Sequence, residues 1–125
     1  RGMAHVQDFL PMSKRDILRF EGCTEAWGKA LAEARLGLED VSLIIPHQAN
    51  RHIIETAARR MDLPIEKFLL NLERYGNMSA ASVPVALCEA VESGRVKHGD
   101  VVVLTAFGAG LTWGSVVLRW QDPAQ

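Results

Sequence analysis

Residues 101–120 read VVVLTAFGAGLTWGSVVLRW, and this stretch decides the fold. The near-continuous apolar run Val101–Phe107 predicts a strand buried on both faces, because a half-exposed strand would alternate apolar and polar residues. The turn Gly108-Ala109-Gly110 returns the chain into a second strand over 111–120, so we expect an antiparallel pair. The shorter apolar run Val41–Ile45, closed by Pro46, predicts another buried strand.

Helical patterns lie between these strands. Apolar residues recur near the helical period of about 3.6 residues between Ile17 and Ala34, after Ser13 as a candidate N-cap. Asn50 is expected to cap the next helix, whose apolar side ends at Met61. The first helix is therefore predicted before the 41–45 strand in the chain, and the second helix after it.

The last predicted helix covers Ala80–Ser93, with Ser79 as its N-cap. It is apolar nearly all round, so we expect it to be buried on more than one side. Short strands are predicted over 4–10 and 68–72. This alternation predicts a single α/β domain over residues 1–125, built as a layered mixed sheet with helices on both faces.

Composition limits the classes of function. The chain has 125 residues, 48% apolar and 23% charged, with a net charge of -1, which indicates a globular protein without the basic field of a nucleic-acid binder. No secretory signal pattern opens the chain, and no apolar run approaches the about 20 residues of a membrane span. Cys23 and Cys88 form neither a disulfide framework nor a metal site, so we expect a cytoplasmic protein without a bound metal.

Polar or glycine-rich turns follow three predicted strands. They are PHQAN at 46–50, YGNMS at 75–79 and FGAG at 107–110. Loops that leave one edge of a sheet converge, so His47 and Asn77 could aim two neutral hydrogen-bond donors at one oxyanion, beside backbone N–H groups of the glycine turn. From the residues alone, a structural histidine, a turn asparagine and a plain hairpin connection remain the commoner readings.

Taken together, PHQAN, then GNMSAASVP at 76–84, then FGAGLTWG at 107–114 resemble the C-terminal motifs of β-ketoacyl-acyl-carrier-protein synthase III. The resemblance runs from about Leu31 to Trp120 and implies half of a thiolase-fold condensing enzyme. That family joins acyl-CoA to malonyl-acyl-carrier protein by decarboxylative Claisen condensation, which starts fatty-acid synthesis. The resemblance implies thioesters of CoA and acyl carrier protein as substrates, and no cofactor.

The same resemblance assigns roles to single residues. His47 and Asn77 match the family's catalytic pair, which hydrogen-bonds the thioester carbonyl while carbon dioxide leaves. Phe107 matches a residue beside the malonyl site, Ala109 lies at the turn that contributes an oxyanion N–H, and Asn50 matches a contact of the pantetheine arm.

The helix after His47 carries three arginines, Arg51, Arg59 and Arg60. A solvated helix face is one reading of such a charge run. The resemblance implies the other, the docking of acidic acyl carrier protein, which a basic patch would steer.

Neither cysteine matches the family's nucleophile, which belongs to an N-terminal half. We therefore expect either that half on the same polypeptide or self-association through the 80–93 helix, whose apolar face would otherwise meet water. A non-catalytic stand-alone half that binds carrier protein or a partner subunit remains an alternative, as does an acyl-tailoring transferase. Whether Arg1-Gly2-Met3 begins a gene product or a cut through a longer one stays open.

Overall fold

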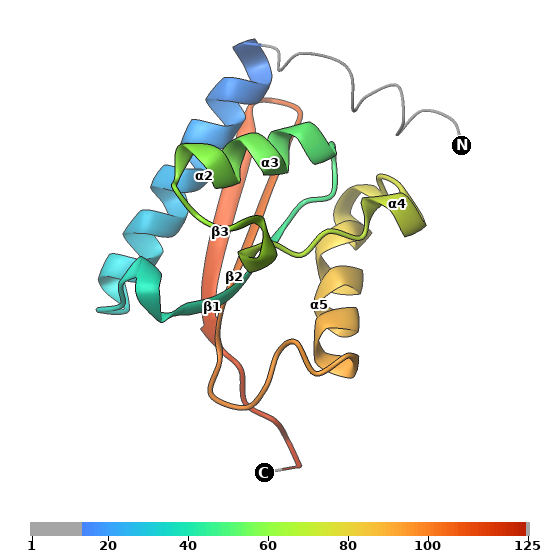
Figure 1. Ribbon diagram of the computed structural model, residues 1–125. Helices are drawn as coiled ribbons and strands as arrows, with labels where there is room; N and C mark the ends of the chain where they lie inside the picture. The colour runs from blue at the N-terminus through green and yellow to red at the C-terminus, as the bar shows by residue number, and fades with distance from the viewer. Residues whose placement is uncertain (1–13, 125) are drawn as a thin grey trace.

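The computed structural model describes residues 14–124 (Figure 1). The strand predicted over 4–10 and the capping role of Ser13 lie outside the described residues. The elements, in chain order, are α2 (Lys14–Glu33), η1 (Leu38–Asp40), β1 (Val41–Pro46), α3 (Arg51–Arg60), η2 (Ile65–Lys67), α4 (Leu72–Tyr75), η3 (Ser79–Ala81), α5 (Ser82–Glu92), β2 (Val101–Gly108) and β3 (Thr112–Arg119).

The three strands form one mixed sheet in the order β1-β2-β3. β1 runs parallel to β2, with Ile44 opposite Val103. β2 and β3 are antiparallel, and Val103 also lies opposite Val117. The antiparallel pair predicted from the turn at 108–110 is therefore confirmed. The parallel pair needs a long crossover, and residues 47–100 supply it with α3 and α5.

Helices cover both faces of this sheet, as predicted. On one face, α2 and α3 pack against the sheet through a core that includes Trp27, Ile54 and Val103. On the other face, α5 packs through Ala86 and Ala90 against a second core. Figure 1 shows α2 and α5 on opposite sides of the strands, with α3 crossing over the strands in this view. The structure is thus a layered α/β fold.

Two predicted elements differ from the structure. Residues 68–72 do not form a strand: Phe68 makes one parallel bridge to Ile44, and Leu72 already begins α4. Phe68 and Leu69 still point to opposite cores, as in a strand, but the extended segment is too short to extend the sheet. The last helix begins at Ser82 rather than Ala80, because Ser79 has φ 52°, outside the extended region that an N-cap adopts.

α5 buries one face rather than several. Its buried residues are Ser82, Ala86 and Ala90, which lie one turn apart. Pro84 and Cys88 on its other side are exposed, so burial on more than one side is not achieved within the described residues. The predicted consequence, an apolar face of this helix that needs a partner, stays a prediction.

Helix α2 contains two glycines, and only Gly22 has a close contact that accounts for it. A Cβ atom at Gly22 would lie 2.3 Å from the Trp113 ring, whereas a Cβ at Gly28 would meet nothing within 4 Å. Gly22 is therefore required by the close approach of α2 to β3. Gly28 has no such role in the described structure.

Candidate functional site

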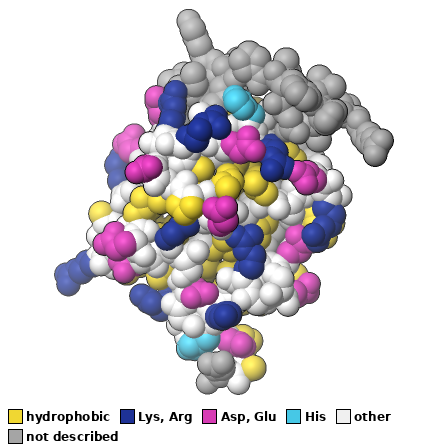
Figure 2. Space-filling view, in the orientation of Figure 1, with side chains coloured by type: hydrophobic (Ala, Val, Ile, Leu, Met, Phe, Trp, Pro, Cys, Tyr) yellow, Lys and Arg dark blue, Asp and Glu magenta, His cyan; other side chains and the backbone are white. Residues whose placement is uncertain are grey.

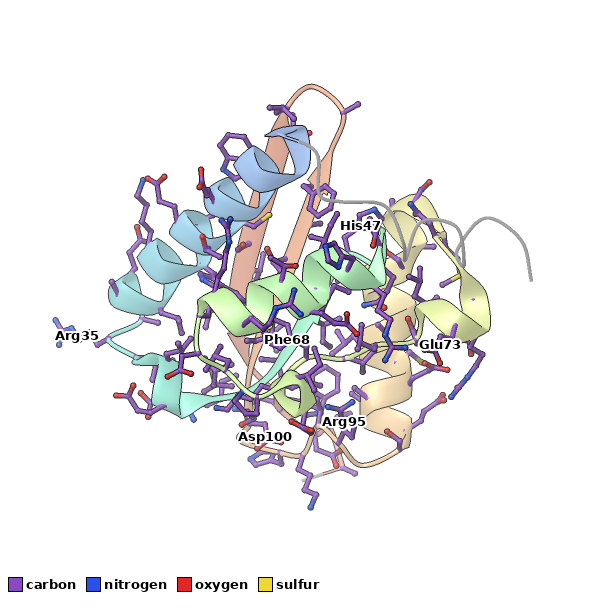
Figure 3. The ribbon with its side chains drawn as sticks, turned by 45° about the horizontal axis from the view of Figure 1, so that its top comes forward. Arg35, His47, Phe68, Glu73, Arg95 and Asp100 are labelled. Carbon is purple, nitrogen blue, oxygen red and sulfur yellow. The ribbon has the colours of Figure 1, made fainter. Side chains whose placement is uncertain are left out.

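A cleft of about 710 Å³ opens where β1 and β2 end and α5 begins. His47 follows β1, Phe107 and Gly108 end β2, and Asn77 precedes α5. All four residues line this cleft, so the strand-end loops converge as expected. In Figure 3, His47 lies beyond the end of β1, between the N-terminal ends of α3 and α5. Three separate segments of the chain therefore build one site.

His47 is half-buried and held at three points. Its backbone N–H donates to the Thr105 carbonyl at 2.8 Å, which extends the β1–β2 pairing past the strand end. Its Nδ1 lies 2.6 Å from the Ser82 hydroxyl. Its ring meets the Phe107 ring edge-on, with centroids 5.5 Å apart. Burial lowers the pKa of His47 below its ordinary value of 6.5, so the imidazole is neutral at pH 7.

Asn77 is oriented by its own loop. Gly76 before it has φ 70° and ψ -165°, a backbone conformation that glycine adopts without steric cost. The Asn77 Oδ1 accepts from the Ser79 backbone N–H at 2.9 Å. Because the carbonyl oxygen is engaged in the loop, the amide NH₂ is the group that remains for a partner in the cleft.

Gln48 links the end of β1 to the segment that leads to Asn77, and this role was not predicted from the sequence. Its side chain is fully buried. The Gln48 Nε2 donates to Pro46 O at 2.9 Å and Leu69 O at 3.0 Å, while its Oε1 accepts from Asn71 N at 3.0 Å. A buried amide with these bonds fixes the end of β1 against the segment that leads to Asn77.

Glu89 on α5 holds the short helix α4 in the same way. Its carboxylate accepts from Asn71 Nδ2 at 2.9 Å, Arg74 Nη1 at 2.6 Å and the Tyr75 hydroxyl at 2.6 Å. These bonds tie both ends of α4 to α5. The loop that carries Asn77 therefore follows a helix whose position is fixed.

Three other predicted site residues occupy different positions. Phe107 lines the cleft beside His47. Ala109 lies in the exposed turn after β2 and accepts from the Thr112 hydroxyl, while its neighbour Gly108 lines the cleft. Asn50 caps α3, accepting from His52 N at 2.8 Å, and lines a small adjoining pocket that His47 also borders. The structure thus brings Phe107 beside His47 in the cleft, whereas Ala109 and Asn50 do not line it.

The three arginines of α3 are not equivalent. Arg51, at the start of the helix, pairs with Glu55 at 2.8 Å and with Glu73. Arg59 and Arg60, in the last turn, are exposed; Arg59 donates to the Thr56 hydroxyl. On the face shown in Figure 2, side chains of both charges are intermixed around a hydrophobic area, so this view shows no uniformly basic patch.

Cys23 is buried and Cys88 is exposed. Cys23 borders the small adjoining pocket, donates to Ala106 O at 3.4 Å, and has a pKa raised by burial. Cys88 lies on the outer side of α5, although the helix that contains it was expected to be buried on more than one side. Neither cysteine lines the cleft that contains His47 and Asn77.

Two broader features of residues 14–124 bear on the class of protein. Within this range, no three metal-ligating side chains gather into a group that could hold an ion. None of the described helices is both long and apolar enough to span a bilayer.

Comparison with known proteins agrees with these motifs. Residues 31–120 match the family described as 3-oxoacyl-[acyl-carrier-protein (ACP)] synthase III C terminal. The β-ketoacyl-[acyl-carrier-protein] synthase III of Fusobacterium nucleatum is 49% identical over 116 residues, which cover 91% of this chain and 35% of that protein. The synthase of the same name from Roseiflexus sp. is 56% identical over 92 residues, covering 74% of the chain and 28% of that protein. The chain therefore spans about a third of the length of these curated relatives.

Solved structures give the same result for the fold. The synthase III from Thermus thermophilus superposes with a TM-score of 0.81 at 46% identity, covering 88% of this chain and 35% of that one. The synthase III from Aquifex aeolicus gives a TM-score of 0.79 at 39% identity, covering 96% and 42%. The predicted thiolase-like fold is thus confirmed. The chain belongs to the 3-oxoacyl-[acyl-carrier-protein] synthase III family and corresponds to its C-terminal part.

Proposed function

We propose that this chain is the C-terminal half of a condensing acyltransferase that joins acyl-CoA to malonyl-acyl-carrier protein. The observation that carries the proposal is that His47 and Asn77, from two separate loops, line one cleft with both side chains neutral. Their hydrogen bonds to Ser82 and Ser79 fix each side chain on one side and leave one polar group free to bind substrate.

The proposed chemistry follows from where charge develops. When the malonyl thioester loses carbon dioxide, the bond between its α-carbon and its carboxylate breaks, and the electron pair spreads onto the thioester oxygen as an enolate. Two fixed neutral donors stabilise that oxygen most when it is charged, which lowers the barrier rather than tightening substrate binding. The enolate carbon then attacks the acyl thioester, and the thiolate leaves. The two thioesters are the only reactants that this reaction requires, so we expect no cofactor.

The acyl-carrying thiolate is expected from the N-terminal half of the complete protein. Cys23 is buried with a raised pKa, which disfavours the thiolate form that attacks an acyl-CoA. Cys88 lies outside the cleft. This division of labour agrees with a chain that spans about a third of its relatives.

We further propose that acyl carrier protein docks near the last turn of α3, in the cytoplasm. Arg59 and Arg60 are exposed there, although Arg60 also pairs with Glu21 at 4.0 Å; Arg51 is half-buried, is engaged with both Glu55 and Glu73, and is the weaker candidate. Contacts between exposed charges predict that the Michaelis constant for malonyl-acyl-carrier protein rises with salt.

The test uses the complete protein with acyl-CoA and malonyl-acyl-carrier protein. Asn77→Asp replaces the amide donor by a carboxylate while its oxygen can still accept from Ser79 N, so the loop is kept. We expect β-ketoacyl product from the wild type and a kcat lower by about 10²–10³ in the variant.

Gln121→Glu is the matched control, because it makes the same charge change at an exposed position after β3. It is expected to react like the wild type. An Asn77→Asp protein that condenses at the wild-type rate contradicts the proposal. A complete protein that binds carrier protein but forms no product supports the non-catalytic alternative instead.

A further inference from the structure

Ser82 is a polar residue on the otherwise apolar buried stripe of α5. Its side chain is fully buried beneath His47. Its Oγ lies 2.6 Å from His47 Nδ1, 2.9 Å from Ser79 O and 3.3 Å from Gln48 N. The catalytic proposal above uses this hydroxyl only to hold the His47 ring in place.

The single hydroxyl proton of Ser82 has two candidate acceptors, and the choice determines the chemistry of His47. If the hydroxyl donates to Ser79 O, His47 must carry its proton on Nδ1, and Nε2 becomes an acceptor. If the hydroxyl donates to His47 Nδ1, the neutral ring carries its proton on Nε2. Only the second arrangement gives the cleft a donor from this ring.

Two observations favour the second arrangement. Ser79 O already accepts the backbone N–H of Ser82, so it does not depend on the hydroxyl. The Ser82 Oγ also lies closer to His47 Nδ1, at 2.6 Å, than to Ser79 O, at 2.9 Å. In either arrangement the Gln48 N–H can donate to the same oxygen.

We propose that Ser82 is a positioning residue that holds neutral His47 as its Nε2–H tautomer, so that a hydrogen-bond donor faces the cleft. Its role in catalysis rests on the function proposed above, whereas the tautomer itself does not. The buried position of Ser82 suits this role, because a hydroxyl shielded from water keeps one orientation.

The direct test is the ¹⁵N NMR spectrum of the complete protein with labelled histidine, recorded above pH 7. We expect His47, assigned by its loss in His47→Gln, to show a protonated Nε2 and an unprotonated Nδ1. A protonated Nδ1 in the wild type overturns the proposal without any variant of Ser82.

The variant test adds Ser82→Ala and Ser82→Thr. We expect Ser82→Ala to mix the two tautomers in the ¹⁵N spectrum and to lower kcat about tenfold with little change in KM, less than the loss of a whole donor. Ser82→Thr keeps the hydroxyl and should recover most of the kcat and the Nε2–H signature. A Ser82→Ala protein with unchanged tautomer and kcat overturns the inference.

The two proposals fail separately. If Asn77→Asp abolishes condensation while Ser82→Ala changes neither spectrum nor kcat, the condensing function stands and the role of Ser82 does not. If Asn77→Asp leaves condensation intact, the function fails, and the wild-type ¹⁵N spectrum still decides which nitrogen of His47 carries the proton.

Discussion

Different contacts hold His47 and Asn77, so different substitutions would displace the two side chains. His47 is fixed by a buried hydroxyl and an aromatic edge, whereas Asn77 is exposed and is fixed by a hydrogen bond to the second residue after it. The environment of His47 therefore depends on packing between β1, β2 and α5. The orientation of Asn77 depends on one turn.

The lowered pKa of His47 gives a pH prediction at this scale. The unfolded chain binds the histidine proton near the ordinary value of 6.5, and the folded chain binds it only at lower pH. The stability that burial of neutral His47 permits is therefore present above pH 6.5 and is lost as the pH falls through the lowered pKa. We expect the His47 ring protons to titrate in NMR spectra with a midpoint below 6.5.

His47→Gln serves as the control for this titration, because it removes the resonance and the acid-side loss of stability together. Stability is followed by urea unfolding at pH 7.5 and 5.5. A His47 midpoint at or above 6.5 would show that burial does not control its charge.

The sequence predicts the residues that line the cleft better than the residues that hold them in place. His47, Asn77 and Phe107 stand in recognisable motifs at strand ends, whereas Ser82 and Gln48 give no signal as a pair, because their contacts join segments 34 residues apart. One usable clue exists: Ser82 shares a buried face with Ala86 and Ala90, and a polar residue on such a stripe needs a hydrogen-bond partner.

At the scale of single elements, α2 offers a matched pair of glycines. Gly28→Ala should stabilise the protein by about 0.5–1 kcal/mol, because alanine favours the helix and nothing lies within 4 Å of the new methyl group. Gly22→Ala should instead destabilise it by about 1–3 kcal/mol, because the methyl group would overlap the Trp113 ring. Denaturant unfolding of both variants measures the difference.

The comparison within this pair removes the shared gain in helix propensity. A Gly22→Ala protein that is as stable as Gly28→Ala would mean that Trp113 moves aside at no cost. Gly22 would then not be needed for the contact between α2 and β3.

Long apolar and amphipathic patterns identify the elements, and local backbone geometry sets their limits. The strands at 41–45 and 101–107 and the helix after Asn50 appear where their patterns predict them. The run 68–72 fails because a short apolar run does not distinguish a strand from the start of a helix. The predicted cap at Ser79 fails because its positive φ, forced by the turn after Asn77, cannot be read from residue type.

For the whole molecule, the open side of α5 and the cleft beside it are the expected contact surface for the N-terminal half. Val116, 56% exposed, lines the cleft from β3. Expressed without that half, residues 14–124 should self-associate, and light scattering should give a mass above the monomer. Val116→Asp should reduce this association, because it places a charge on the apolar surface.

Ala124→Asp is the control for association, since Ala124 is exposed near the C-terminal end of the chain and lies outside the cleft lining. It should associate like the unmodified chain. A clean monomer of the unmodified chain at high concentration would show that this surface does not require a partner.

The central claim is that His47 and Asn77 act as one pair on one oxygen, and a double-mutant cycle tests it most directly. The measurement is the rate of carbon dioxide release from malonyl-acyl-carrier protein by the complete protein and by His47→Ala, Asn77→Ala and the double variant. We predict that each single change lowers the rate by about 10²–10³ and that the double variant is little slower than either. Losses that multiply in the double variant, or a single variant at the wild-type rate, would contradict the claim.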